Sequence, residues 1–211
     1  VQGAPKGVKG ISLFVVPKIL VNDDGTLGAD NEVALAGLFH KMGGRAQTST
    51  ALSFGEKDGA IGYLVGEENQ GLKYMFHMMN EARIMVGTSG ATLAVAGYQY
   101  AVDYAKNRPQ GRLPSCKDPL SPMVNIIEHA DVRRMLLAQK AYAEGALALV
   151  LYGTQLSDDA KTAPSQEARE YAHTLLDFLT PIIKTWPSEY GTKANDFAIQ
   201  VLGGHGYINE H

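Results

Sequence analysis

The spacing of apolar residues changes at Gly71, and this change constrains the fold more than any other feature of the chain. Before Gly71, short apolar runs at 11–16, 48–54 and 60–64 are separated by turn-forming residues, a pattern typical of strands. After Gly71, apolar residues recur every three or four positions, which is the period of a helix with one buried face. The chain therefore combines two kinds of structure, strands first and helices afterwards.

Three long helices are predicted from the second pattern, over residues 71–106, 124–153 and 166–202. The polar stretch 157–165 indicates the connection between the last two helices. Pro181 and Pro187 fall inside the third helix, where each removes an intrahelical hydrogen bond, so we expect a kink or a short break. The small residues at 87–91 would let a neighbouring helix approach the first one closely.

The predicted fold class is α+β, with a partial β-domain of short antiparallel strands followed by an antiparallel bundle of long α-helices. Long helices joined by short connections favour neighbours that run in opposite directions. The expected domain limits are 1–66 for the β part and 67–211 for the helical bundle, which we expect to be incomplete at its end.

The composition argues against several classes of protein. The net charge is −3 and no segment is strongly basic, so we do not expect nucleic-acid binding. The single cysteine, Cys116, excludes an internal disulfide framework and is typical of a reducing, cytoplasmic location. No run of 18 apolar residues is present, so no membrane span is expected. The six histidines lack the spacing of metal ligands, and we predict no metal site.

Two segments at helix ends have both an ordinary and a functional interpretation. The run QVLGGHGY at 200–207 places paired glycines after a helix, where they can form a C-cap or a bare turn against phosphate groups. Arg108 follows the first helix, where it can complement the helix dipole or bind a pyrophosphate with two hydrogen bonds. Neither segment decides the function alone.

Phe76, Asn80 and Arg83 share one face of the first helix by their spacing. Phe76 alone is typical of a packed core. An amide and a guanidinium on the same stripe are unusual in a core and favour a groove that holds a polar, anionic ligand.

The order of the segments resembles that of the acyl-CoA dehydrogenase family over essentially the whole chain. GVKGISLFVVPK at 7–18 is similar to the middle β-domain of that family, and GEENQGL at 66–72 to the entry of its helical bundle. NEAR at 80–83, YAKNR at 104–108 and QVLGGHGY then follow at the expected separations. The runs at 129–137 and 184–186 resemble the bacterial subgroup that includes the 3-methylmercaptopropionyl-CoA dehydrogenases.

The resemblance implies FAD as the cofactor and a homodimer, or a dimer of dimers, whose subunits share it. Arg108 would contact the FAD pyrophosphate, and Gln200, Gly203 and Gly204 would line an FAD that a neighbouring subunit binds. The implied fold is a β-domain followed by a four-helix bundle. The first bundle helix would border the CoA and acyl channel with three residues, Phe76, Asn80 and Arg83.

The implied activity is oxidation of an acyl-CoA to the 2,3-enoyl-CoA. A carboxylate removes the α-proton while the β-hydride passes to the flavin, and an electron-transfer flavoprotein would accept the electrons. The usual base is a Glu expected after His211, so no catalytic residue is predicted in this chain. A minority of the family place the base where Ala82 stands here, which leaves the neighbouring Glu81 as an alternative, whereas Glu210 matches a structural Glu.

Three other interpretations stay open from the sequence. The chain could be a non-catalytic helical-bundle module that serves assembly, or a stable proteolytic remnant without flavin activity. An oxidase that passes electrons to oxygen would carry the same residues. We expect the chain to be part of a longer protein, because the family's N-terminal helical domain and the front of its β-domain do not precede it.

Overall fold

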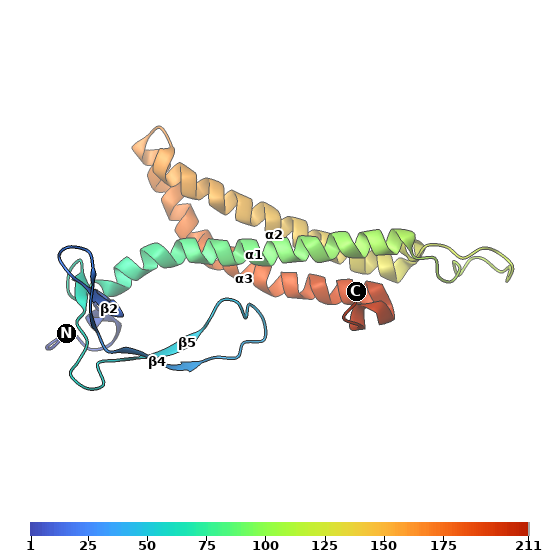
Figure 1. Cartoon of the computed structure of the whole chain (residues 1–211). Coiled ribbons are helices and arrows are strands. Elements are labelled where there is room, and N and C mark those ends of the chain that lie inside the picture. Colours follow the sequence, from blue (N-terminus) through green and yellow to red (C-terminus); the bar gives the residue numbers. More distant parts are fainter. Residues whose placement is uncertain (211) are drawn as a thin grey trace. The chain divides into compact units, whose positions relative to one another are not determined.

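The computed structural model describes residues 1–210, which form two compact units (Figure 1). The first unit is Val1–His77 and the second begins at Met78. Helix α1, Gly71–Asn107, contributes to both units. The domain limits expected from the sequence, 1–66 and 67–211, stay a prediction.

The first unit contains six short strands in three antiparallel pairs, β1 with β6, β2 with β3 and β4 with β5. Their bounds are β1 Leu13–Val15, β2 Ile19–Val21, β3 Leu27–Asp30, β4 Val33–Leu38, β5 Thr50–Phe54 and β6 Tyr63–Val65. The expected strand regions correspond to β1, β5 and β6, with β6 displaced toward Val65. The strands β2, β3 and β4 were not predicted, because their short runs of apolar and small residues show no clear alternating pattern.

A buried asparagine joins separate segments of the first unit. Asn31 is only 3% exposed, and its side-chain Nδ2 donates to the carbonyls of Pro17 at 2.8 Å and Ile61 at 2.9 Å. Its Oδ1 accepts from the Ile61 amide at 2.8 Å. The side chain therefore satisfies backbone groups that lie between strands, which is the usual condition for burying a polar residue.

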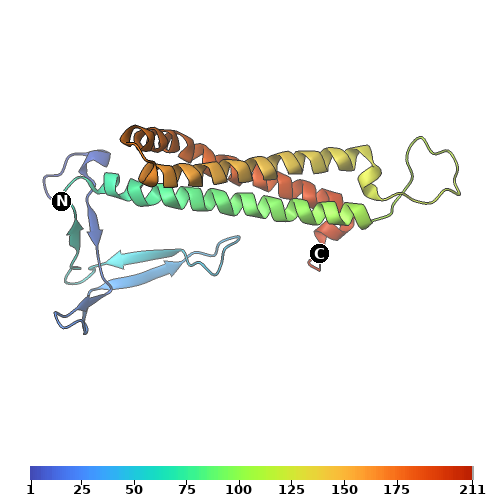
Figure 2. The ribbon, with the colours of Figure 1, turned by 90° about the horizontal axis from the view of Figure 1, so that it is seen from above.

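The second unit is built from three long helices that lie side by side (Figure 2). From Met78 onward α1 packs with α2, Ala130–Thr162, and α3, Gln166–Leu202, and consecutive helices run in opposite directions. A short 3-10 turn, Ile126–Glu128, precedes α2. Small side chains fill much of the core, among them the fully buried Ala91, Ala94, Ala101, Ala105, Ala143, Ala146 and Ala194. The predicted α+β class is confirmed.

The second helix begins and ends later than predicted. Residues expected in its first turn are extended instead, because the Val124 amide donates to the Gly111 carbonyl and the Ile126 amide to the Arg108 carbonyl. Its far end reaches Thr162, so most of the polar stretch predicted as a connection is helical. Those polar residues form a solvated face of the helix, and local composition alone does not separate such a face from a loop.

The third helix contains both prolines without a break. Pro181 and Pro187 lie inside α3, and Pro187 is buried. The helix changes direction along its length (Figure 1), as expected where a proline removes a hydrogen bond. The Ser165 hydroxyl caps its first turn by accepting from the Ala168 amide at 3.1 Å.

Glycines bring the backbones of α1 and α3 into direct contact, as the small residues at 87–91 predicted. A methyl group at Gly87 would lie 2.3 Å from the Ile183 carbonyl oxygen, and one at Gly90 would lie 3.0 Å from the Pro187 carbonyl carbon. On the other side, a methyl group at Gly191 would lie 2.9 Å from the Gly90 carbonyl oxygen. We call these residues of the two helices the glycine seam.

One buried amide in α2 lacks hydrogen bonds in the described part of the chain. Gln139 is 0% exposed, and neither its Nε2 nor its Oε1 has a partner there. Because desolvating an unpaired amide costs about 1–3 kcal/mol, Gln139→Met is expected to raise the free energy of unfolding by about 1–2 kcal/mol. Urea unfolding measures the change.

The matched control for Gln139→Met is Gln155→Met on the exposed face of the same helix. Its effect should stay within about 0.5 kcal/mol of zero. A loss of stability in Gln139→Met would contradict the prediction, because it would show that the amide makes hydrogen bonds in solution.

Candidate functional site

The candidate residues of the second unit lie toward opposite ends of α1. Asn80 and Arg83 are in the early part of the helix, and Arg108 follows its last residue, Asn107. From residue 83 to residue 108 a helix rises about 37 Å at 1.5 Å per residue. Two separate groups of side chains therefore need to be considered.

At the late end, α3 stops at a bare glycine turn. Gly203 has φ 60° and ψ −134°, a backbone conformation that favours glycine, and its amide donates to the Gln200 carbonyl. The turn continues as a 3-10 helix, Gly203–Tyr207. A methyl group at Gly206 would lie 2.4 Å from the Ile199 carbonyl oxygen, whereas one at Gly203 or Gly204 would meet no atom within 4 Å. The turn is thus packed against α3 at Gly206 and open at the glycine pair.

A tyrosine of α1 holds this turn in place. The Tyr104 hydroxyl and His205 Nδ1 are 2.9 Å apart, and their rings meet edge to face at 5.8 Å. Arg108 comes four residues after Tyr104 and directly after the last residue of α1, so it lies at the same end of the bundle as the glycine turn that Tyr104 contacts. Gln200 Nε2 donates to the Tyr207 hydroxyl. The four residues predicted to bind the cofactor are therefore at one end, while their roles stay a prediction.

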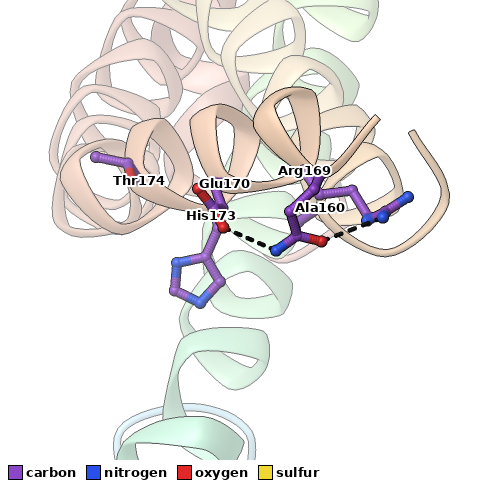
Figure 3. A pocket seen from close by; sticks show the side chains of 6 residues that line it. Ala160, Arg169, Glu170, His173 and Thr174 are labelled. Atoms are coloured by element: carbon purple, nitrogen blue, oxygen red, sulfur yellow. Dashed lines mark hydrogen bonds between the residues drawn. The ribbon is translucent and has the colours of Figure 1, made fainter. Parts of the chain in front are cut away.

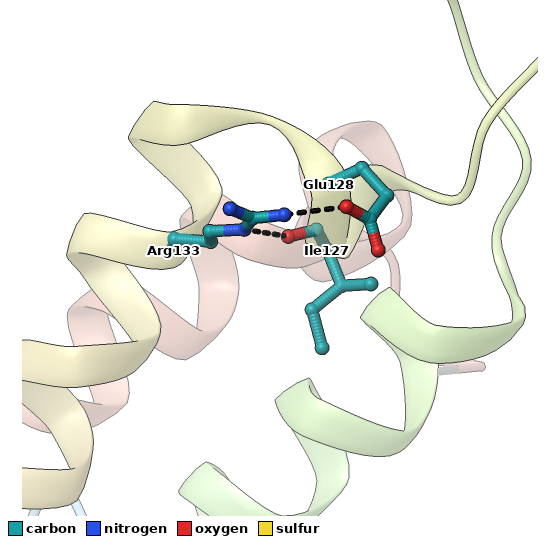
Figure 4. Close-up of polar contacts among 3 residues, drawn as sticks. All are labelled: Ile127, Glu128 and Arg133. Atoms are coloured by element: carbon teal, nitrogen blue, oxygen red, sulfur yellow. Dashed lines mark hydrogen bonds and ion pairs between the residues drawn. The ribbon is translucent and has the colours of Figure 1, made fainter.

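An arginine clamp orders the chain where it returns beside Arg108. Arg133 Nε donates to the Ile127 carbonyl at 3.0 Å, and its guanidinium forms an ion pair with Glu128 (Figure 4). A ring nitrogen of His129 is 2.7 Å from the Gln110 carbonyl oxygen. These contacts fix the end of the connection between α1 and α2. No role was predicted for Arg133, although it lies in the run at 129–137.

The same connection carries the single cysteine, which is exposed. A hydrogen bond with the Ser121 side chain, followed by one with the Asp118 backbone, lowers the pKa of the Cys116 thiol below its ordinary value. Arg112 Nε also donates to the Ser121 carbonyl. The contacts are local to the connection and bring no second reactive group to the thiol.

At the early end of α1, the two polar candidates contact each other and a residue of α3. Arg83 Nη1 donates to Asn80 Oδ1 at 3.5 Å, and Asn80 Nδ2 donates to Asp177 Oδ1 at 3.3 Å. The other oxygen, Asp177 Oδ2, is 3.3 Å from His173 Nδ1. Phe76 belongs to the first unit, and 40% of its surface is exposed. Sequence reasoning missed Asp177 and His173.

Glu81, the alternative base, makes an ordinary surface contact. Its carboxylate is 3.5 Å from Lys161 Nζ, and the two side chains are 71% and 68% exposed. Exposed ion pairs contribute about 0–1 kcal/mol to stability and give no sign of a specialised environment. Ala82, beside it, is exposed and has no ionisable group. A catalytic role for Glu81 stays a prediction.

Among residues 1–210, no group of three His, Cys, Asp or Glu side chains is arranged to hold a metal ion. No helix there is both long enough and apolar enough to cross a membrane.

Comparison with known proteins gives one family and several relatives. Residues 69–211 match the family model described as acyl-CoA dehydrogenase, C-terminal domain. The chain is 42% identical over 207 residues to 3-methylmercaptopropionyl-CoA dehydrogenase of Ruegeria pomeroyi, covering 98% of this chain and 34% of that protein. It is 40% identical over 213 residues to a butyryl-CoA dehydrogenase of Syntrophomonas wolfei, covering 99% of this chain and 35% of that protein.

Among solved structures, an acyl-CoA dehydrogenase from Bacillus anthracis complexed with FAD has the same fold. The TM-score is 0.65 at 18% identity, and the match covers 95% of this chain and 34% of the other. The chain spans about a third of the length of the curated relatives it matches.

Proposed function

The chain belongs to the acyl-CoA dehydrogenase family, and from that membership we propose that the protein oxidises an acyl-CoA thioester to the 2,3-enoyl-CoA with FAD. The observation that carries the proposal is the glycine turn at 203–204. This turn exposes bare backbone at the late end of α1, and Arg108 follows that end. A cationic side chain at the same end of the bundle as an open, uncharged backbone turn suits a bound pyrophosphate.

The late end of the bundle fits the cofactor by its chemistry. Arg108 would hold the pyrophosphate with two charge-assisted hydrogen bonds, and Gly203 and Gly204 would let the ligand lie against the backbone. Gln200 would line the same surface. When bound, FAD supplies the acceptor for the β-hydride of the substrate.

The early end would border the substrate. Arg83 contributes a positive charge and Asn80 an amide, and both suit a polar, anionic ligand such as the CoA part of the thioester. Phe76, on the part of α1 that belongs to the first unit, would contribute an apolar surface to substrate binding. We assign the usual base, which removes the α-proton, to none of the described residues. Glu81 is the alternative base among them.

The proposed partners follow from the same family. We assign the late end of the bundle to an FAD held largely by a second copy of the chain, in a dimer or a dimer of dimers. The rise of about 37 Å between Arg83 and Arg108 supports separate roles for the two ends. An electron-transfer flavoprotein in the cytoplasm is the proposed acceptor of the electrons.

At least two acyl groups are candidates for the substrate of this protein. The Ruegeria and Syntrophomonas relatives are 42% and 40% identical to the chain, and their names give different substrates. Both thioesters should therefore be tried.

The test is anaerobic flavin reduction in the full-length protein. After reconstitution with FAD, addition of butyryl-CoA or 3-methylmercaptopropionyl-CoA should bleach the absorbance of the oxidised flavin. A colourless protein that stays apo with added FAD would support the non-catalytic assembly module instead. Peroxide formation in air, without a need for electron-transfer flavoprotein, would identify an oxidase.

A further inference from the structure

A line of side-chain contacts crosses from α1 to α3 at the proposed substrate end. It runs from Arg83 through Asn80 to Asp177 and ends at His173. We propose that Asp177 is a positioning residue for the oxidation: it fixes the Asn80 amide, which in turn holds the Arg83 guanidinium toward the substrate. The proposal rests on the proposed function of Asn80 and Arg83.

A side-chain oxygen of Asp177 sets the orientation of the Asn80 amide. This oxygen accepts a hydrogen bond, and the Asn80 group that faces it, at 3.3 Å, is the donating Nδ2. The amide oxygen is then turned toward Arg83, whose Nη1 donates to it at 3.5 Å. A carboxylate on α3 thereby orients a guanidinium on α1.

Asn80 also keeps two opposite charges apart. The Asp177 carboxylate and the Arg83 guanidinium each bind one end of the same amide. Asn80 is therefore a spacer as well as a ligand group.

The contact of Asp177 with His173 is compatible with this role. His173 contacts its second oxygen at 3.3 Å, which holds the carboxylate from the other side. Figure 3 shows His173 on α3 beside a separate set of contacts. There Gln166 Nε2 donates to Glu170 at 2.8 Å, and Arg169 Nη2 donates to the Gln166 oxygen at 3.1 Å.

Exposure makes the network suitable for mutation. The Asp177 side chain is 54% exposed and that of His173 is 70% exposed, so their contacts add little to folding stability. Substitutions here should leave the fold intact, and circular dichroism checks that they do. An effect on KM then reports on positioning.

The test is a double-mutant cycle in the full-length protein loaded with FAD, with butyryl-CoA as the probe. Asn80→Ala should raise KM about 10-fold, equivalent to about 1.4 kcal/mol of binding free energy, with kcat little changed. Asp177→Asn should change KM by less than about 3-fold, because its side-chain oxygen still accepts from Asn80.

The decisive variants are Asp177→Ala and the double mutant Asn80→Ala/Asp177→Ala. Asp177→Ala removes the acceptor of the Asn80 amide and should raise KM by at least about 3-fold with kcat little changed. The double mutant should be no more impaired than Asn80→Ala, because Asp177 acts through Asn80 and the two effects are then not additive. Glu170→Ala, on the same helix but outside the line of contacts, is the control and should leave KM unchanged. An Asp177→Ala variant with the wild-type KM, or a double mutant in which the two single effects multiply, would overturn the role of Asp177.

A failure of the proposed function would give a different experimental result from a failure of the Asp177 assignment. A wild-type protein that binds FAD but whose flavin no acyl-CoA reduces would remove the proposed activity and, with it, the assignment of Asp177. A wild-type protein that turns over while Asp177→Ala keeps the wild-type KM would overturn the assignment of Asp177 alone.

Discussion

Gly87→Ala is expected to lower the free energy of unfolding by about 3–5 kcal/mol, whereas Gly145→Ala should raise it by about 0.5–1 kcal/mol. The two substitutions add the same methyl group to a helical glycine. At Gly87 that group would lie 2.3 Å from a backbone oxygen of Ile183, and a backbone atom moves only with its helix. At Gly145 it would meet no atom within 4 Å.

The opposite signs separate packing from helix propensity. Alanine favours a helix over glycine by about 0.8–1 kcal/mol, and this gain applies to both positions. Only Gly87 belongs to the glycine seam, so only there does the steric cost exceed the gain. Urea unfolding of the two variants measures both changes, and equal stabilisation at both positions would show that the α1 and α3 backbones lie farther apart than described.

Arg108→Gln is expected to weaken FAD binding about 10- to 100-fold, the loss expected when charge-assisted hydrogen bonds worth about 1.5–3 kcal/mol are removed. Glutamine keeps a hydrogen-bond donor on a shorter side chain and removes the positive charge. Quenching of flavin fluorescence during titration of the apoprotein measures the dissociation constant.

Arg112→Gln is the matched control for the cofactor site. Arg112 lies in the same connection, but its Nε donates to the Ser121 carbonyl. Its substitution should leave FAD affinity unchanged, although the net charge changes by the same amount as in Arg108→Gln. Equal weakening in both variants would mean that general charge attraction, and not a contact from Arg108, governs the binding of the cofactor.

The sequence predicted the parts of the fold that depend on local pattern. The helices α1 and α3, and the antiparallel character of the short strands, followed from periodicity and turn residues and are confirmed. The family resemblance is confirmed as well. The start of α2 was predicted too early, because the extended residues before it pair with the chain near Arg108, and such distant pairing leaves no periodic signal.

The candidate site was predictable only one element at a time. Asn80 and Arg83 stood out because polar residues shared a helix face with an aromatic one. Their contact with Asp177 joins residues 97 positions apart in the sequence, so spacing could not reveal it. A carboxylate and a histidine at helical spacing, His173 and Asp177, are also common on solvent-exposed faces, which gives them little weight before the helices are assembled.

The glycine seam has a consequence for the response of the bundle to cold. Contacts between bare backbones bury little hydrocarbon, so they add little to the heat capacity of unfolding. Their attraction comes from dispersion between closely fitted atoms, which does not fade on cooling as the hydrophobic contribution does. Near 0 °C, the pairing of α1 with α3 should therefore outlast contacts made by large apolar side chains.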